Sequence, residues 1–198
     1  MPFIQWISED EAQGEVAKGY QFYFQKRPER TKVADIIKCF SHRPEFMQQV
    51  MDFSWQVHFS DGHLPERVKE MIATLVSGQN RCPYCMHSHA YFLSLQGAEE
   101  AAVAAIGRGD IENAPITEAE RALLRFAKLL THEGYKNTPE EVQKVRDAGW
   151  ADPQIAEAVY ITAMFAFFNR VADAFGLVDP QYESLSPSGP VPHTPPPP

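Results

Sequence analysis

This sequence has few cysteines, no excess of basic residues and no long apolar run. Three cysteines in 198 residues are too few, and of the wrong parity, for a secreted disulfide framework. Acidic residues outnumber Lys and Arg by 26 to 18, which argues against a nucleic-acid-binding surface because such a surface needs clustered positive charge. No apolar run approaches the roughly 18–20 residues that cross a bilayer, and acidic residues at 9–11 exclude a signal peptide. These absences predict a soluble, cytoplasmic protein that binds neither nucleic acid nor membrane.

Strand patterns are absent too, because no β-branched run alternates polar and apolar residues. Apolar residues instead recur with helical spacing, as in residues 123–130. Helix starts are marked by Thr117-Glu118-Ala119-Glu120, Thr138-Pro139 and Asp152-Pro153. The sequence therefore predicts an all-α fold, a single compact domain of about eight helices. One of the following nine stretches would merge with a neighbour: 10–26, 31–40, 43–60, 65–79, 83–96, 98–107, 117–132, 138–148 and 153–175.

Prolines concentrate at the C-terminus. Seven of the 16 prolines lie within residues 187–198, in a stretch that has no apolar face to bury. Such composition is typical of an extended segment with polyproline character. We therefore predict a helical domain over residues 1–183 and an extended or disordered Pro-rich tail over residues 184–198.

Two of the three cysteines form the pair Cys82-Pro83-Tyr84-Cys85 at a predicted helix start. Two intervening residues bring the sulfurs within bridging range, as in a reversible dithiol–disulfide pair. Unpaired N–H groups and the positive end of the helix dipole favour a thiolate at this position. We expect Cys82, which lies nearer the helix start, to be the more exposed thiol.

Two residues that can move a proton flank this pair. His89 follows Cys85 by one helical turn on the same face, and an ordinary pKa of about 6.5 suits it to accept a thiol proton near neutral pH. Glu70 lies opposite the apolar stripe of the predicted helix 65–79, which indicates a solvated face. The small residues beside Glu70 would equally let another helix approach, so the periodicity leaves both positions open.

Structural interpretations compete with these functional ones. A Cys-x-x-Cys pair can hold zinc when further donors lie close, but the spacing of His87 and His89 on one helix points them apart and disfavours zinc. Cys39 lies in an apolar run and is expected in the core. The remaining histidines are expected at surface or core positions rather than in catalysis: His42, His58, His63, His132 and His193.

Two further segments invite interpretation. The aromatic segment Tyr20–Phe24 favours packing or a subunit contact over a cofactor site. Asn169-Arg170, inside the last apolar helix, is either a buried polar pair or part of a site. The sequence alone does not decide between these two positions for Asn169-Arg170.

The spacing of the candidate residues resembles a known pattern. Glu70, eleven residues, Cys82-Pro83-Tyr84-Cys85, three residues and His89 resemble the alkylhydroperoxidase D motif of the carboxymuconolactone decarboxylase superfamily. The similarity covers roughly residues 40–176, and the length and N-terminal extension resemble the branch of peroxidase-related proteins. Well-known members have a histidine immediately before the second cysteine, where this chain has Tyr84.

The resemblance implies an all-helical fold that assembles as trimers or hexamers. It also implies a thiol peroxidase with an antioxidant role that needs neither cofactor nor metal. Glu70 and His89 would relay a proton, Cys85 would attack the peroxide and Cys82 would resolve the product. The decarboxylase branch does not depend on a Cys-x-x-Cys pair, so the pair argues against that branch.

We therefore predict a thiol-dependent hydroperoxide reductase, or a closely related disulfide oxidoreductase. Its partners would be a small peroxide substrate and an external dithiol or thiol-protein reductant. Two alternatives remain: a non-enzymatic redox sensor or scaffold, and a carboxymuconolactone decarboxylase-type enzyme with an incidental cysteine pair. The apolar surface of Tyr20–Phe24 and residues 153–175 predicts a homo-oligomer, as does the assembly into trimers or hexamers that the resemblance implies.

Overall fold

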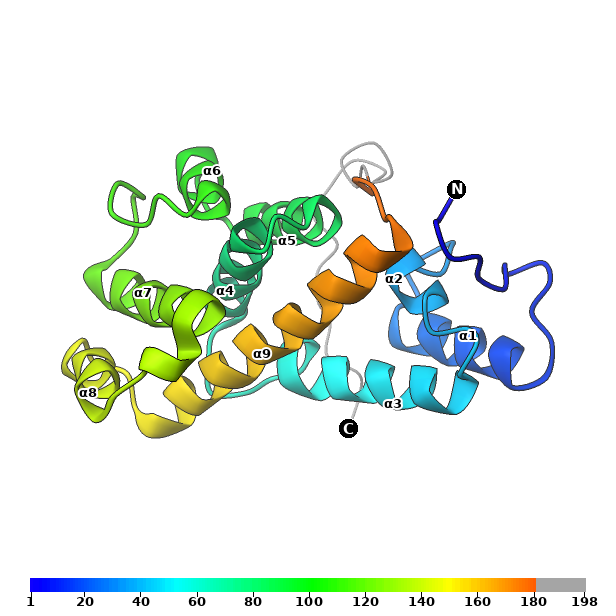
Figure 1. The fold of residues 1–198 in the computed structure, drawn as a ribbon, viewed down its shortest axis with the longest axis horizontal. Coiled ribbons are helices and arrows are strands. Elements are labelled where there is room, and N and C mark those ends of the chain that lie inside the picture. The colour runs from blue at the N-terminus through cyan, green and yellow to red at the C-terminus, as the bar shows by residue number, and fades with distance from the viewer. Residues whose placement is uncertain (181–198) are drawn as a thin grey trace.

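The computed structural model describes residues 1–180, which form nine α-helices and no strands (Figure 1). The α-helices are α1 (Gly14–Lys26), α2 (Asp35–Lys38), α3 (Pro44–Ser54), α4 (Glu66–Gln79), α5 (Pro83–Leu95), α6 (Glu100–Arg108), α7 (Glu118–Glu133), α8 (Pro139–Asp147) and α9 (Asp152–Phe175). A π-helical turn, η1 (Trp55–Phe59), continues α3, and a short 3-10 turn, η2 (Gly134–Lys136), follows α7. The predicted all-α fold is confirmed. The predicted domain end at 183, the Pro-rich tail 184–198 and His193 lie outside the described residues.

The predicted helices from residue 65 onward agree with the structure to within two residues at each end. The N-terminal predictions are less accurate. The first helix begins at Gly14 instead of residue 10, and α2 covers only four residues of the predicted 31–40. Neither α1 nor α2 has a side-chain N-cap, a proline in its first turn or a glycine C-cap, whereas most of the later helices have at least one of these signals.

Helix α4 lies at the centre of the molecule, where it packs against α5, α6, α7 and α9 (Figure 1). Ten consecutive residues of α4, Val68–Ser77, are buried. A helix that is enclosed on every side buries its polar residues together with its apolar ones. Every charged residue in this stretch therefore needs a partner inside the protein.

The N-terminal helices α1, α2 and α3 gather at one end of the molecule, beside α9 (Figure 1). The aromatic segment Tyr20–Phe24 packs against the core of the same chain: Tyr20 is buried, and Phe22, Tyr23 and Phe24 are partly buried. The Tyr20 hydroxyl donates a hydrogen bond to the Ile7 carbonyl at 2.6 Å. This segment thus holds the N-terminal arm onto the domain.

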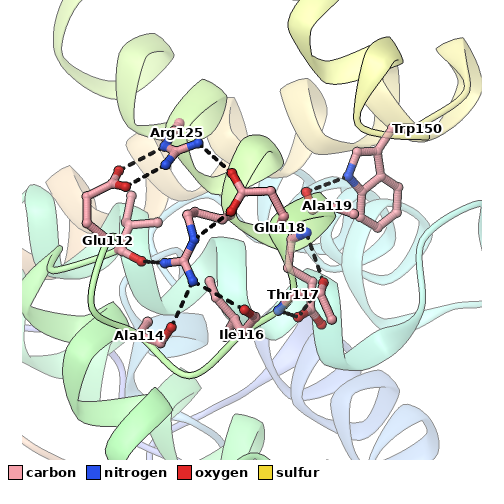
Figure 2. Close-up of polar contacts among 11 residues, drawn as sticks. Glu112, Ala114, Ile116, Thr117, Glu118, Ala119, Arg125 and Trp150 are labelled. Carbon is pink, nitrogen blue, oxygen red and sulfur yellow. Dashed lines mark hydrogen bonds and ion pairs between the residues drawn. The ribbon is translucent and has the colours of Figure 1, made fainter.

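The connection between α6 and α7 is fixed by polar contacts (Figure 2). Thr117 and Glu120 form the predicted capping box at the start of α7. The guanidinium of Arg125 bridges Glu112 and Glu118, and Trp150 Nε1 donates to the Ala119 carbonyl at 2.7 Å. The Arg125 pairs fasten the connection to α7, and the Trp150 bond links α7 to the segment between α8 and α9, at the end of the molecule opposite α1 (Figure 1).

Helix α9 is long and apolar enough to span a membrane by length and composition, which the sequence analysis did not expect. Its most apolar window has a mean hydropathy of 1.3 but is 56% buried inside the protein. A core helix of a globular domain passes the same test, and α9 contacts α4, α5 and α7 along its length. The packing thus accounts for its apolar character.

Candidate functional site

The turn between α4 and α5 positions the two paired cysteines. Arg81, in this turn, adopts a left-handed backbone conformation with φ of 59°. This conformation is uncommon for a residue other than glycine and is found most often at turns and functional sites. The backbone N–H of Cys82 donates to the Ser77 carbonyl at 3.0 Å, which folds the turn back onto α4. Pro83 then occupies the first turn of α5, as predicted.

Both thiols are buried, which corrects the expectation that Cys82 is the more exposed. Cys82 is 1% exposed and Cys85 is 4% exposed. Asp173, near the end of α9, lies beside the Cys82 thiol. A hydrogen bond with Cys85, burial and Asp173 all raise the pKa of the Cys82 thiol. Cys82 is therefore held as a protonated thiol beside Cys85, and all three cysteines are free thiols.

Glu70 is 2% exposed and lies between two imidazoles, so the solvated position that its periodicity indicated is wrong. His89 Nδ1–H donates to Glu70 Oε2 at 2.6 Å, and His58 Nε2–H donates to Glu70 Oε1 at 2.8 Å. The helix that approaches Glu70 is α5, as the small neighbouring residues allowed. A carboxylate only accepts hydrogen bonds, so these contacts fix the tautomers and leave Nε2 of His89 as its basic nitrogen.

The electrostatics of this cluster keep Glu70 anionic. Burial opposes its ionisation, but the charges and hydrogen bonds of His89 and His58 outweigh burial and lower the pKa of Glu70 to about 2. Burial lowers the pKa of His89 below its ordinary value, although Glu70 acts in the opposite direction. A neutral imidazole backed by a carboxylate can accept one proton at neutral pH.

His58 is the site residue that the sequence analysis missed. It was expected at a surface or core position away from chemistry; it is buried at 1% exposure but hydrogen-bonded to Glu70. It comes from η1, and π-helical turns occur frequently at functional sites. The sequence shows only that His58 precedes Glu70 by twelve residues. The two lie in different helical segments separated by a loop, so no helical periodicity relates them.

A cavity of about 130 Å³ opens beside Cys85 and His89. Both residues line it from one face of α5, one turn apart, as their spacing predicted. Its wall is rich in aromatic side chains: Tyr23, Trp55, Phe59, Tyr84, Phe92, Phe165 and Phe168. A small molecule in this cavity would contact the Cys85 thiol and an imidazole together.

The other residues considered from the sequence have structural contacts. Cys39 is a core cysteine, as expected, and burial raises the pKa of its thiol to about 12. His87 pairs with Asp179 rather than with the cysteines. Asn169 is buried and links α9 to Ser77 and Asn80 at the end of α4, whereas Arg170 is exposed. Asn169-Arg170 is thus not a buried pair, and Asn169 supports the turn before Cys82.

The same cluster could hold a metal ion. His58, Glu70 and His89 each offer a donor atom, and these atoms lie within 4.8 Å of one another. Within residues 1–180, neither Cys82 nor Cys85 belongs to this group of possible metal ligands. The donors already satisfy one another through direct hydrogen bonds, so an ion would have to replace two such bonds.

Comparison with protein families links this geometry to known proteins. Residues 44–129 match the model of the carboxymuconolactone decarboxylase family, a segment that contains Glu70, Cys82, Cys85, His89 and His58. No curated protein sequence matches the chain at a significant level.

Solved structures share the fold. The alkylhydroperoxidase AhpD core of an uncharacterized peroxidase-related protein from Ralstonia eutropha JMP134 superposes with a TM-score of 0.78 at 21% identity, covering 90% of this chain and 95% of that chain. A peroxidase-related protein from Silicibacter sp. TM1040 gives 0.75 at 21% identity, with 85% and 86% covered. The debrominase Bmp8 in complex with 2,3,4-tribromopyrrole gives 0.70 at 17% identity, with 88% and 91% covered.

Proposed function

We propose that the cysteine pair of this chain reduces hydroperoxides, because residues 44–129 match the carboxymuconolactone decarboxylase family and the fold is similar to that of a peroxidase-related protein. The observation that carries the proposal is the buried His58–Glu70–His89 cluster beside a cavity that Cys85 lines. A dithiol that served only as a structural clamp would need neither a proton acceptor nor a substrate cavity. We also propose an antioxidant role in the cytoplasm, a compartment that keeps thiols reduced.

The proposed cycle begins when His89 Nε2 accepts the proton of the Cys85 thiol. The Cys85 thiolate attacks one oxygen of the O–O bond, which breaks, and the departing alkoxide takes the proton back from His89 and leaves as an alcohol. Cys85 is then a sulfenic acid. The Cys82 thiol attacks its sulfur, which forms a disulfide and releases water. An external dithiol reduces the disulfide to two thiols and becomes a disulfide itself.

The surroundings of the two cysteines support these proposed roles. Cys85 lines the cavity, where a peroxide can reach it. Cys82 lies beneath the end of α9 with a raised pKa, which suits a thiol that reacts second. Cys39 is a poor nucleophile because its pKa is raised to about 12.

The testing experiment is peroxide consumption by the wild type beside Cys85→Ser, Cys82→Ser and Cys39→Ser, with a dithiol reductant. Cys85→Ser should abolish turnover, Cys82→Ser should stop multiple turnover after Cys85 is oxidised, and Cys39→Ser should retain activity. Peptide mapping after mild peroxide treatment should find the Cys82–Cys85 disulfide. Stoichiometric zinc in protein purified without added metal, or Cys39 in the main bridge, would contradict the proposal.

The same experiment separates the alternative functions. A redox sensor or scaffold would form the Cys82–Cys85 disulfide without sustained turnover and would change its partner binding instead. A decarboxylase-type enzyme would retain its activity in both serine variants. Sustained turnover that depends on both cysteines excludes both alternatives.

We also propose that the protein is a homo-oligomer, a trimer or hexamer. Several large apolar side chains remain exposed on the single chain, among them Phe46, Phe53 and Tyr160. Such surface is commonly covered by a second copy. Light scattering should report a species larger than the 22.4 kDa chain at micromolar concentration; a monomer would refute this.

A further inference from the structure

The cavity beside Cys85 carries positive charge on one wall. Lys26, at the end of α1, and Arg27 and Arg30, in the turn that follows, all line it. These residues precede the segment that matches the family model, so they belong to this chain's N-terminal region. The cations are therefore a feature of this cavity that the family match does not assign.

Each cation lies over an aromatic ring of the same cavity. Lys26 Nζ lies 5.1 Å from the centre of the Trp55 ring. The guanidinium carbons of Arg27 and Arg30 lie 5.3 and 5.7 Å from the Phe59 and Phe92 rings. Cation–π contacts of this kind hold a charge at the border of an apolar cavity. The cations thus keep fixed positions between the aromatic wall and solvent.

Three cations line the cavity, and two carboxylates lie near it, Glu29 and the buried Glu70 behind His89. No Asp or Glu lines the cavity within the described residues. Glu29 neutralises part of the charge, because it pairs with Arg27 at 2.7 Å and lies 3.6 Å from Arg30. Across residues 1–180, Lys26 forms no ion pair and only contacts rings. On a chain with a net charge of −8, this local excess is a specific feature.

We infer that the cavity selects an anionic hydroperoxide. Its acid group would lie against Lys26, Arg27 and Arg30, and its O–O group would lie at Cys85. A cavity near 150 Å³ accommodates a molecule the size of benzene, so about 130 Å³ suits one aromatic ring or a short alkyl chain. This inference rests on the proposed function for the peroxide end, but the anion-binding end stands on the cavity alone.

The test compares an acid with its uncharged analogue and needs no turnover. The dissociation constants of 3-phenylpropionate and 3-phenylpropanamide are measured by calorimetry and by fluorescence, since Trp55 lines the cavity. The acid should bind about tenfold tighter at low salt, the effect of one charge-assisted contact. The difference should shrink as salt rises.

Lys26→Gln should remove most of the preference for the acid, and it disturbs no ion pair. Lys18→Gln is the matched control, because Lys18 lies on the same helix, is exposed and pairs with Glu15 away from the cavity. Lys18→Gln should keep the preference and the turnover of cumene hydroperoxide.

The outcomes separate this inference from the proposed function. Equal binding of acid and amide, no binding of either, or a preference that persists in Lys26→Gln would overturn the inference even if cumene hydroperoxide is reduced. Tight, Lys26-dependent binding of the acid without any peroxide turnover would support the anion site and refute the peroxidase.

Discussion

Two neighbouring residues of α4, Lys69 and Glu70, are both buried, and their hydrogen-bond partners differ in kind. Lys69 Nζ contacts Glu157 Oε1 at 2.5 Å and donates to the Ser60 carbonyl at 2.9 Å. Glu157 also accepts backbone N–H bonds from His63 and Leu64, at 2.5 and 3.0 Å. Among residues 1–180, Glu70, one residue further along α4, accepts hydrogen bonds only from the imidazoles of His58 and His89.

The pKa values of Glu70 and Glu157 are both lowered, so a lowered pKa alone does not identify a catalytic carboxylate. For Glu157, burial opposes the ionised form, and Lys69 and the backbone N–H groups outweigh it. Neither Lys69 nor these backbone N–H groups line the cavity beside Cys85. The partners of Glu70 are two imidazoles, and one of them, His89, lines the same cavity as Cys85. We therefore interpret the Lys69–Glu157 pair as structural, and we propose proton transfer only for the cluster around Glu70.

The largest expected effect is on turnover. Glu70→Gln should reduce peroxide turnover at pH 7 by roughly 10²–10⁴-fold, because general acid–base help is worth that much. His89→Ala should do the same, and the double variant should be little worse than the poorer single one, since the two act as a unit. Steady-state kinetics with cumene hydroperoxide measures this effect. Full activity of Glu70→Gln would show that Glu70, like Glu157, has only a structural role.

Next in size is a loss of stability in the other cluster. Lys69→Met leaves the Glu157 carboxylate buried with only backbone donors, and breaking a buried ion pair in this way costs about 3–5 kcal/mol. Thermal and denaturant unfolding should show this loss, while turnover per folded molecule stays at the wild-type level. A fall in turnover without a fall in stability would contradict a purely structural role for Lys69.

Acid should weaken the fold through Glu70. Its folded pKa of about 2 lies below the ordinary 4.5, so its contribution is complete above pH 4.5 and is lost as pH falls towards 2. The wild type should therefore lose more stability over that range than Glu70→Gln does, by on the order of 3 kcal/mol. Glu157 is common to both proteins, so its own titration cancels. Parallel stability curves in denaturant titrations would contradict the lowered pKa.

The smallest effect is expected at His58. Its hydrogen bond orients Glu70 and stabilises the anion, and a bond to a charged group is worth roughly 1.5–3 kcal/mol. His58→Gln should lower turnover by roughly 10–100-fold and raise the pH at which activity appears. His132→Gln, at an exposed position on α7, is the control that should change neither.

The sequence predicted local features of this protein well and tertiary contacts less well. Caps, prolines and periodicity depend on neighbouring residues, so they located α4 to α9 and the Cys85–His89 spacing. The burial of Glu70 depends on which helix covers its face, and the burial of Cys82 depends on α9 folding over the turn. The pairing of His58 with Glu70 joins a π-helical turn to a distant helix, and no local pattern encodes it.

The central claim is that the Glu70 cluster takes the proton of Cys85. Stopped-flow measurement of Cys82–Cys85 disulfide formation after one equivalent of hydroperoxide tests it directly, in wild type and Glu70→Gln from pH 6 to pH 9. The account predicts a large difference in rate at pH 7 that narrows as pH approaches the free thiol value of about 8.5, where solvent supplies the thiolate. Two rate profiles that coincide at pH 7 would contradict it.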